Sequence, residues 1–458
     1  MYNFREFLPY YKRNMAVALP VMITQAGQVL VQIADNIMVG HVGTAQLAGV
    51  SFANALFMIA MVTLIGFSQG LTPLVGQSIG KGESGEAAGY LRNSIVLNAI
   101  AYGTIFLILL AVLALMPHMG QDPEVLVYAR QYFSINMFSL IPMLFFFTSR
   151  FFAEGVGNTS YAMWITVIAN MMNIFLNWVL IFGHFGLPAL GVRGAALSTL
   201  ISRIFTAGVF AAILFRAEVF RKFTVQAFGS GTMVPGSKVR ISWHRMGEIL
   251  RLSIPIAFSS MLEVTAFSFA AIMVGWMGKT ELAAHQVANN LGQLSFLIAT
   301  GVGAAATIRV SHQYGAGRYH ETLMAGLAAI HMAVMYMCTC GTLFLSLRHL
   351  LPAVYTNDLE VISIASRLIV VLAMYQVVDA IQLTSISALR GLKDTKVPMI
   401  YAALAYYGVA IPSGYLLGFT LGIGPAGVWY GLLAGLSVAA VLYYTRFRRK
   451  CAAMPKNG

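Results

Sequence analysis

Three carboxylates stand inside long apolar stretches of this chain, at Asp35, Glu263 and Asp379. A charged side chain within a membrane-spanning segment is costly, and such residues commonly mark ion pathways or proton relays. An acid in this position either carries a proton or holds a cation. That chemistry suits a carrier that exchanges protons or Na⁺ for a cationic substrate.

Amide and hydroxyl side chains recur around the acids at steps of three and four residues, which place them on one face of a helix. Stripes of this kind face a cavity or another helix rather than lipid. Hydrogen bonds between packed helices explain the amides equally well. The residues predicted to line a substrate cavity are Gln28, Gln32, Asn173, Asn177, Asn289, Gln293, Tyr375 and Gln382.

Ion pairing is the structural alternative for the three acids. Arg203 is the only basic residue that lies deep in an apolar stretch. One guanidinium cannot neutralise three carboxylates, so we predict that Glu263, Asp379 and Asp35 bind cations. Na⁺, at Glu263 and Asp379, is the only metal ion predicted.

The composition places these residues in a membrane. Hydrophobic residues make up 58% of the chain and charged residues only 10%, with a mean hydropathy of +0.75. Soluble proteins carry about 25% charged residues, so this chain lacks the side chains for an aqueous surface. The net charge of +13 does not indicate nucleic acid, because the basic residues lie in loops between apolar stretches rather than on one face.

Twelve apolar stretches, in two sets of six, are each long enough to cross the roughly 30 Å hydrocarbon core as a helix. We therefore predict an all-α integral membrane protein of twelve transmembrane helices. Most of the 29 Lys and Arg residues fall on one side when the N-terminus is inside, which predicts that both termini are cytoplasmic. The predicted parts are an N-terminal six-helix lobe (1–215), a cytoplasmic basic linker (216–251), a C-terminal six-helix lobe (252–445) and a cytoplasmic basic tail (446–458).

The two sets of helices repeat each other in sequence. Ile37 to Gly40 is identical to Ile272 to Gly275, 235 residues later. Six helices per half give both halves the same orientation, an arrangement found in transporters. The acids do not repeat, because this shift aligns Glu263 with Gln28.

These features resemble the multidrug and toxic compound extrusion (MATE) family, in its NorM-type bacterial branch, over nearly the whole chain. The resemblance implies a V-shaped fold of two six-helix bundles and the export of cationic, amphiphilic compounds against inward flow of Na⁺ or H⁺. It also implies that Glu263 and Asp379 are cation-binding acids of the C-terminal half and Asp35 the acid of the N-terminal half, with Asn173 and Asn177 lining the N-terminal pocket. The motifs that carry it are Pro20 with Asp35 to Gly40, Asn173 to Trp178, Pro255 with Glu263 to Thr265, and Tyr375 to Ala380 with Leu389 to Asp394.

Two other functions are weaker fits to the sequence. A lipid-linked oligosaccharide flippase of the same superfamily would need basic residues around its anionic substrate, and only Arg203 is available. An intramembrane enzyme would need a catalytic pair such as HExxH, which does not occur. We therefore predict a multidrug efflux antiporter, not an enzyme, that works as a monomer in the bacterial inner membrane. Its predicted partners are small cationic drugs and the lipid bilayer, without nucleic acid, and it needs no cofactor besides Na⁺ or H⁺ as the coupling ion.

Overall fold

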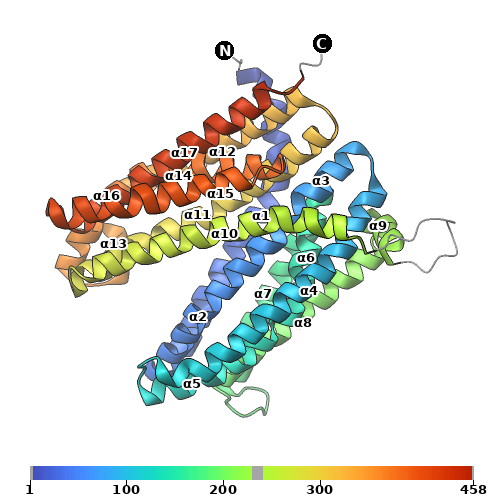
Figure 1. Cartoon of the computed structure of the whole chain (residues 1–458). Coiled ribbons are helices and arrows are strands. Elements are labelled where there is room, and N and C mark those ends of the chain that lie inside the picture. The colour runs from blue at the N-terminus through green and yellow to red at the C-terminus, as the bar shows by residue number, and fades with distance from the viewer. Residues whose placement is uncertain (1–3, 229–240, 456–458) are drawn as a thin grey trace. The chain divides into compact units, whose positions relative to one another are not determined.

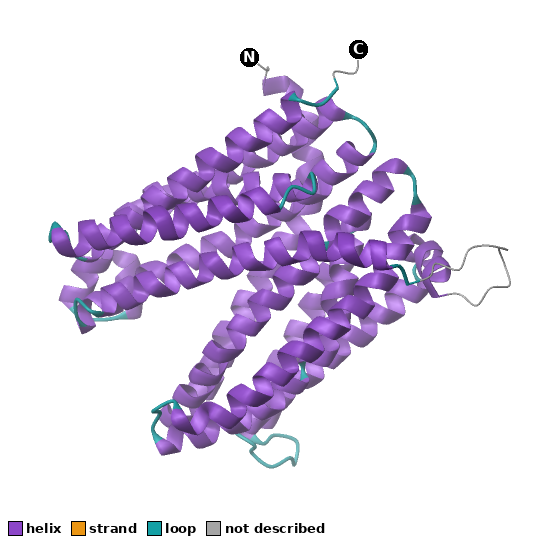
Figure 2. Ribbon diagram, in the orientation of Figure 1, coloured by secondary structure: helices purple, strands orange, loops and turns teal. Residues whose placement is uncertain are grey.

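The computed structural model describes residues 4–228 and 241–455, and in these ranges it contains helices and no strand (Figures 1 and 2). Helices satisfy every backbone hydrogen bond within one segment, which a lipid environment requires. The long elements, in chain order, are α1 (Phe4–Gly40), α2 (Thr44–Gln69), α3 (Leu71–Lys81), α4 (Ser84–Leu115), α5 (Pro123–Phe138), α6 (Leu140–Val156), α7 (Ser160–Phe182), α8 (Val192–Arg216), α9 (Glu218–Phe228), α10 (Trp243–Gly275), α11 (Lys279–Gly315), α12 (Tyr319–Ser346), α14 (Leu359–Gly391) and α17 (Pro425–Ala452).

Short elements complete the chain. They are η1 (Met116–His118), α13 (Leu350–Tyr355), α15 (Lys396–Ala403), η2 (Leu404–Ala410), α16 (Ile411–Tyr415) and η3 (Leu416–Thr420). The segments η2 and η3 are π-helical, so they widen the helix that runs from α15 to the loop before α17. Such segments are rare and are frequent at functional sites.

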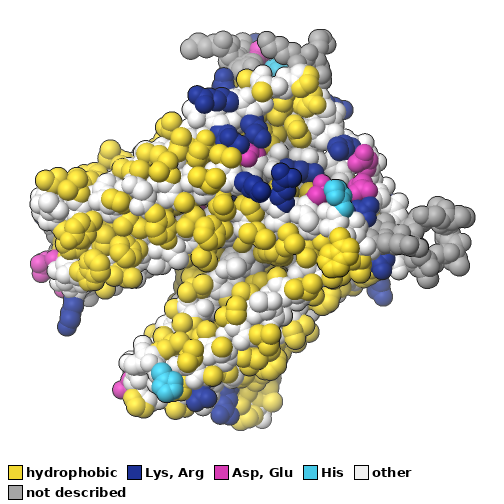
Figure 3. All heavy atoms as spheres, viewed as in Figure 1, with side chains coloured by type: hydrophobic (Ala, Val, Ile, Leu, Met, Phe, Trp, Pro, Cys, Tyr) yellow, Lys and Arg dark blue, Asp and Glu magenta, His cyan; other side chains and the backbone are white. Residues whose placement is uncertain are grey.

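The described helices confirm the predicted membrane fold. Eleven segments are long and apolar enough to cross a membrane, and the pair α5 and α6, bent by 47°, makes a twelfth. Apolar side chains cover most of the visible face along these helices (Figure 3), as lipid contact requires. The chain is thus a multi-pass membrane protein.

Matching turns end corresponding helices in the two halves. Gly82 follows α3 with a φ of +80°, and Gly317 follows α11 with a φ of +71°. Glycine adopts this left-handed conformation without steric cost. The internal repeat therefore extends from sequence to local backbone geometry.

The contacts divide the chain into two compact units. The N-terminal unit is Ile23–Ala257, and the C-terminal unit joins Met1–Met22 to Phe258–Gly458. Both boundaries fall inside a helix, in α1 and in α10, shortly after Pro20 and Pro255. Proline removes a backbone hydrogen bond and weakens a helix at that point.

Side-chain contacts join the first part of α1 to the C-terminal unit and the first part of α10 to the N-terminal unit. The Nδ2 of Asn14, on α1, donates to the carbonyl of Ala325 on α12 at 2.9 Å. Arg245, on α10, makes two hydrogen bonds to Glu86 on α4 at 2.8 and 3.0 Å. By their contacts, residues 1–22 belong to the C-terminal unit and residues 252–257 to the N-terminal unit.

The predicted linker and tail are partly helical. Of the linker 216–251, residues 218–228 form α9 and α10 begins at Trp243, while residues 229–240 lie outside the described residues. In the tail, α17 continues to Ala452, and residues 456–458 lie outside the described residues. Asp394 binds Arg446 at 2.7 Å and Lys450 at 3.3 Å, which fastens this end of α17 to the loop after α14.

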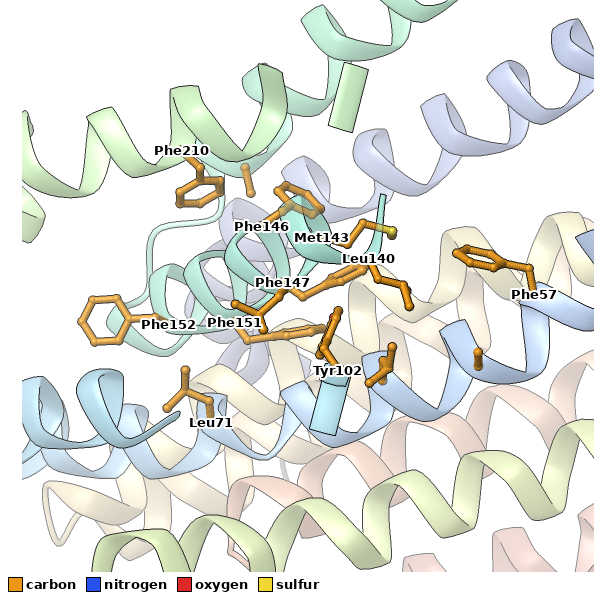
Figure 4. Packing of buried hydrophobic residues seen from close by; sticks show 14 of the residues in the cluster. Phe57, Leu71, Tyr102, Leu140, Met143, Phe146, Phe147, Phe151, Phe152 and Phe210 are labelled. Atoms are coloured by element: carbon orange, nitrogen blue, oxygen red, sulfur yellow. The ribbon is translucent and has the colours of Figure 1, made fainter. Parts of the chain in front are cut away.

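Aromatic side chains from α6 form the centre of the N-terminal unit (Figure 4). The ring of Phe146 lies 6.0 Å from that of Phe210 on α8, and Phe147 stacks on Phe151 at 6.1 Å. Aromatic pairs at these separations stabilise a core by about 0.5–1.5 kcal/mol beyond the area they bury. The pair of Phe146 and Phe210 packs α6 against α8, the helix that carries Arg203.

Candidate functional site

Two carboxylates predicted to bind a cation come together in the C-terminal unit. Asp379, on α14, is 1% exposed, and Glu263, on α10, is half-buried. They interact electrostatically with each other, and Tyr375, one helical turn before Asp379, interacts with both. We call Glu263, Asp379, Tyr375, Gln382 and Tyr406 the carboxylate cluster.

Three helical segments position the carboxylate cluster. Tyr375, Asp379 and Gln382 lie one turn apart on one face of α14, which packs between α11, α12 and α17. Tyr406 lies in the π-helical segment η2, and its ring is 1% exposed. The Nε2 of Gln382 donates to the Oη of Tyr406 at 3.0 Å, and Tyr406 also hydrogen-bonds Glu263. The hydroxyl of Tyr406 thus connects α10 to α14.

Several oxygens of the carboxylate cluster are left without protein partners. Neither carboxylate oxygen of Asp379 has a hydrogen-bond partner among the described residues, and the same holds for the Oε1 of Gln382. A buried polar group without a partner costs about 1–3 kcal/mol, and more when it is charged. Carboxylate and amide oxygens are ligands that hard cations prefer. The residues present therefore fit either a proton or a small cation such as Na⁺.

Arg390 is a basic residue that interacts electrostatically with one of these acids. It lies at the end of α14, is half-buried, and interacts electrostatically with Glu263. Its influence falls on Glu263, and Glu263 is in turn the acid that acts on Asp379. The cluster therefore has two carboxyl groups and one interacting guanidinium.

The third predicted acid, Asp35, belongs to a separate network in the N-terminal unit. The Nδ2 of Asn177 donates to Asp35 and also to the Oδ1 of Asn173, the latter at 3.2 Å. Ser198, on α8, donates to the Oδ1 of Asn177 and so fixes the amide orientation. Asn177 is fully buried and Asn173 is 5% exposed. The predicted residues Asp35, Asn173 and Asn177 are therefore brought together within the N-terminal unit.

Arg203 lies close to this network. It is on α8 and donates through Nη1 to the Oδ1 of Asn136 at 3.0 Å and to the Oγ of Ser139. Its guanidinium carbon lies 5.5 Å from the ring centre of Phe57. Through space it interacts with Asp35.

The remaining predicted cavity residues join neither network. Gln28, Gln32 and Gln293 expose their side chains, and Asn289 is half-buried on α11. Their sequence pattern does not separate them from the buried amides, because both sets recur at helical spacing. Their proposed role in substrate binding remains a prediction.

Sequence reasoning missed Tyr406 and Ser198. Tyr406 stands in an apolar stretch without polar neighbours at helical spacing. Only the packing of η2 against α17 and the bond to Gln382 reveal its place. Ser198 gave a weak signal, since Ser202 follows it four residues later on α8. Its bond to Asn177 depends on how α7 packs against α8.

Over most of its length the chain is similar to known proteins. The MatE family model matches residues 20–179 and 255–416, one segment in each half. A "Probable multidrug resistance protein NorM" of Agrobacterium fabrum is 32% identical over 448 residues, covering 96% of this chain and 94% of that protein. One with the same name from Xanthomonas campestris is 34% identical and covers 94% and 93% of the two chains.

Solved structures share the fold. A eukaryotic MATE transporter, AtDTX14, matches with a TM-score of 0.84 at 22% identity, over 97% of this chain and 98% of that one. A structure titled as the outward-facing conformation of a multidrug resistance MATE family transporter matches with a TM-score of 0.86 at 22% identity, over 97% and 96%. With the family match across both halves, these findings show that the chain is a membrane transporter, not an enzyme, and that it belongs to the MatE family.

Proposed function

We propose that this transporter is a multidrug efflux antiporter that exports small cationic, amphiphilic compounds in exchange for Na⁺ or H⁺. The observation that carries the proposal is Asp379, a buried carboxylate whose two oxygens lack partners among the described residues and which lies beside Glu263. A site with excess negative charge and free oxygens binds a cation strongly. The names of the NorM relatives support the substrate class.

Competition for negative charge supplies the coupling. A proton or Na⁺ that enters from outside binds at Glu263 and Asp379 and lowers the affinity for a cationic substrate. The substrate leaves, and on the inner side another substrate molecule displaces the coupling cation. Exchange of one coupling cation for one monovalent substrate cation moves no net charge, so the concentration gradient of the coupling cation drives it, at about 1.4 kcal/mol for each tenfold difference. Asp35 is the corresponding acid of the N-terminal unit.

The orientation belongs to the same proposal. Counted along the sequence with the N-terminus inside, most Lys and Arg residues fall in segments on the inner side, which the positive-inside rule assigns to the cytoplasm. We accordingly place both termini in the cytoplasm and the transporter, as a monomer, in the bacterial inner membrane. The coupling cation then enters the carboxylate cluster from the periplasmic side.

Everted membrane vesicles provide the test of the proposed exchange. Ethidium is added to vesicles that contain the transporter, and its movement into the vesicles is followed. The measurement is made first under an imposed Na⁺ gradient and then under an imposed pH gradient. We expect ethidium uptake into the vesicles under one of the two gradients and none when that gradient is dissipated. Vesicles without the transporter serve as the control. Equal ethidium movement with and without the transporter under both gradients refutes the antiport.

A further inference from the structure

An amphipathic helix, α9, lies between two helices that are long and apolar enough to cross the membrane. It follows α8 after the extended residue Ala217 and precedes α10. The side chains that α9 buries recur at helical spacing and so lie on one face. They are Phe220, Phe223, Thr224 and Ala227. The opposite face of α9 is exposed, and the proposed exchange does not use it.

Contacts fold α9 back over the last turn of α8. The Oγ1 of Thr224 donates to the carbonyl oxygen of Leu214 at 3.2 Å. The rings of Phe215 and Phe228 lie 6.0 Å apart. Leu214 and Phe215 belong to the membrane-crossing helix, so α9 lies level with the point at which α8 leaves the membrane. An amphipathic helix in that position lies along the membrane surface.

The start of α10 is held beside α9 by α4. The Nη1 of Arg92 donates to the carbonyl oxygen of Ala227 at 3.2 Å. The Oδ1 of the next residue, Asn93, accepts a hydrogen bond from the backbone N–H of Ser242 at 2.8 Å. Trp243 follows at once, close to α9 (Figure 1), and is 86% exposed. Tryptophan is enriched where membrane helices meet the headgroup region.

The exposed side chains of this region combine apolar and basic groups. The apolar ones are Phe215, Val225, Phe228 and Trp243. The basic ones are Arg216, Arg221 and Lys222. We call these seven residues the α9 surface. Lipid acyl chains fit the first group and phosphate groups fit the second.

Positive charge predominates on the α9 surface. Glu218 is the exposed acid of α9. The acids that adjoin it on α4 and α10 already have partners among the described residues. Glu86 accepts two hydrogen bonds from Arg245, and Glu248 accepts one from Tyr90. The three basic side chains therefore remain available to an anion.

We propose that the α9 surface binds the headgroups of anionic phospholipids, with its rings among the upper acyl chains and its basic side chains on the phosphates. Charge complementarity selects an anionic lipid over a zwitterionic one. The exposed rings beside the charges select a lipid over a soluble anion. The inference requires only that the chain is a membrane protein, so it stands or falls independently of the proposed antiport.

Unfolding temperatures measure this binding, because a ligand that binds only the folded state stabilises it. The full-length transporter in detergent is titrated with phosphatidylglycerol and, separately, with phosphatidylcholine or inorganic phosphate. We expect saturable stabilisation by phosphatidylglycerol that 500 mM NaCl weakens, and little by the other two. Equal stabilisation by the two lipids, or the same stabilisation by inorganic phosphate, overturns the inference.

Variants locate the binding on the α9 surface. One basic residue near an anionic membrane contributes about fivefold in affinity. Replacing Arg216, Arg221 and Lys222 together by Gln should therefore raise the phosphatidylglycerol content that gives half-maximal stabilisation about 100-fold. The double variant Arg216→Lys and Arg221→Lys keeps the charge and should behave as the wild type.

The control removes two exposed arginines elsewhere in the same unit. Arg130→Gln and Arg193→Gln lie on α5 and at the start of α8, and this pair should leave the wild-type titration unchanged. If the triple variant cannot be purified, Lys222→Gln alone should shift the half-maximal content about fivefold. A wild-type titration in the triple variant, or in Lys222→Gln where that variant replaces it, overturns the inference. A shift in the control pair as large as in the triple variant also overturns it.

Discussion

Replacing Asp379 with asparagine abolishes uphill export. The substitution keeps the shape and the hydrogen-bonding oxygen but removes the charge that attracts the coupling cation. Because each coupled cation contributes about 1.4 kcal/mol under a tenfold gradient, its loss lowers the attainable substrate ratio about tenfold at that gradient. Glu263→Gln should have the same direction of effect, since its carboxylate shares the site with Asp379.

The measurement is gradient-driven ethidium accumulation by purified variants in liposomes, with unfolding temperature recorded in parallel. Asp358→Asn is the matched control, because Asp358 is an exposed cap at the start of the same helix α14. Asparagine caps a helix about as well as aspartate, so this variant should transport normally. Full uphill export by both Asp379→Asn and Glu263→Gln would mean that the coupling cation binds elsewhere.

Gly431→Val should prevent the C-terminal unit from folding normally. A Cβ at Gly431, on α17, would fall against the Cα and N of Gly414 and lie 2.8 Å from the carbonyl oxygen of Ala410. These are backbone atoms, so no side-chain rotation relieves the contact. Small residues let transmembrane helices approach this closely, and overpacking typically costs about 1–3 kcal/mol.

The readout for Gly431→Val is the yield of monodisperse protein in detergent and its unfolding temperature. Gly103→Val is the control, since nothing lies within 4 Å of a Cβ at Gly103, on α4. We expect a clear loss for Gly431→Val and near-normal behaviour for Gly103→Val. Equal stability of the two variants would contradict the close packing of α16 on α17.

The sequence predicted the membrane fold and the acids because both depend on local composition. An apolar stretch of helical length specifies a membrane helix regardless of its neighbours. A carboxylate within it is conspicuous for the same reason. The division of α1 and α10 between the two units could not be predicted this way, because it rests on contacts such as Asn14 with Ala325 and Arg245 with Glu86.

The candidate site shows the same limit. Tyr375, Asp379 and Gln382 share one helix, so their spacing places them on one face. Tyr406 joins them through the packing of a π-helical segment that no sequence period indicates.

The two halves are similar in sequence, but they carry their charged residues at different positions. A shift of 236 residues aligns Asp379 with Met143, and the same shift aligns Arg203 with Ala439. The C-terminal unit therefore has an unbalanced acid where the N-terminal unit has methionine. The N-terminal unit has a cation where the C-terminal unit has alanine. This asymmetry is the physical basis for assigning cation exchange to the carboxylate cluster.

Cation release on substrate binding tests the central claim most directly. Purified transporter in weakly buffered detergent solution is titrated with ethidium, while a pH indicator follows protons and radioactive Na⁺ follows bound sodium. We predict that ethidium binding releases H⁺ or Na⁺ from the wild type and that Asp379→Asn binds ethidium without releasing either. Saturable ethidium binding to the wild type with no release of either cation would contradict the competition between substrate and coupling cation.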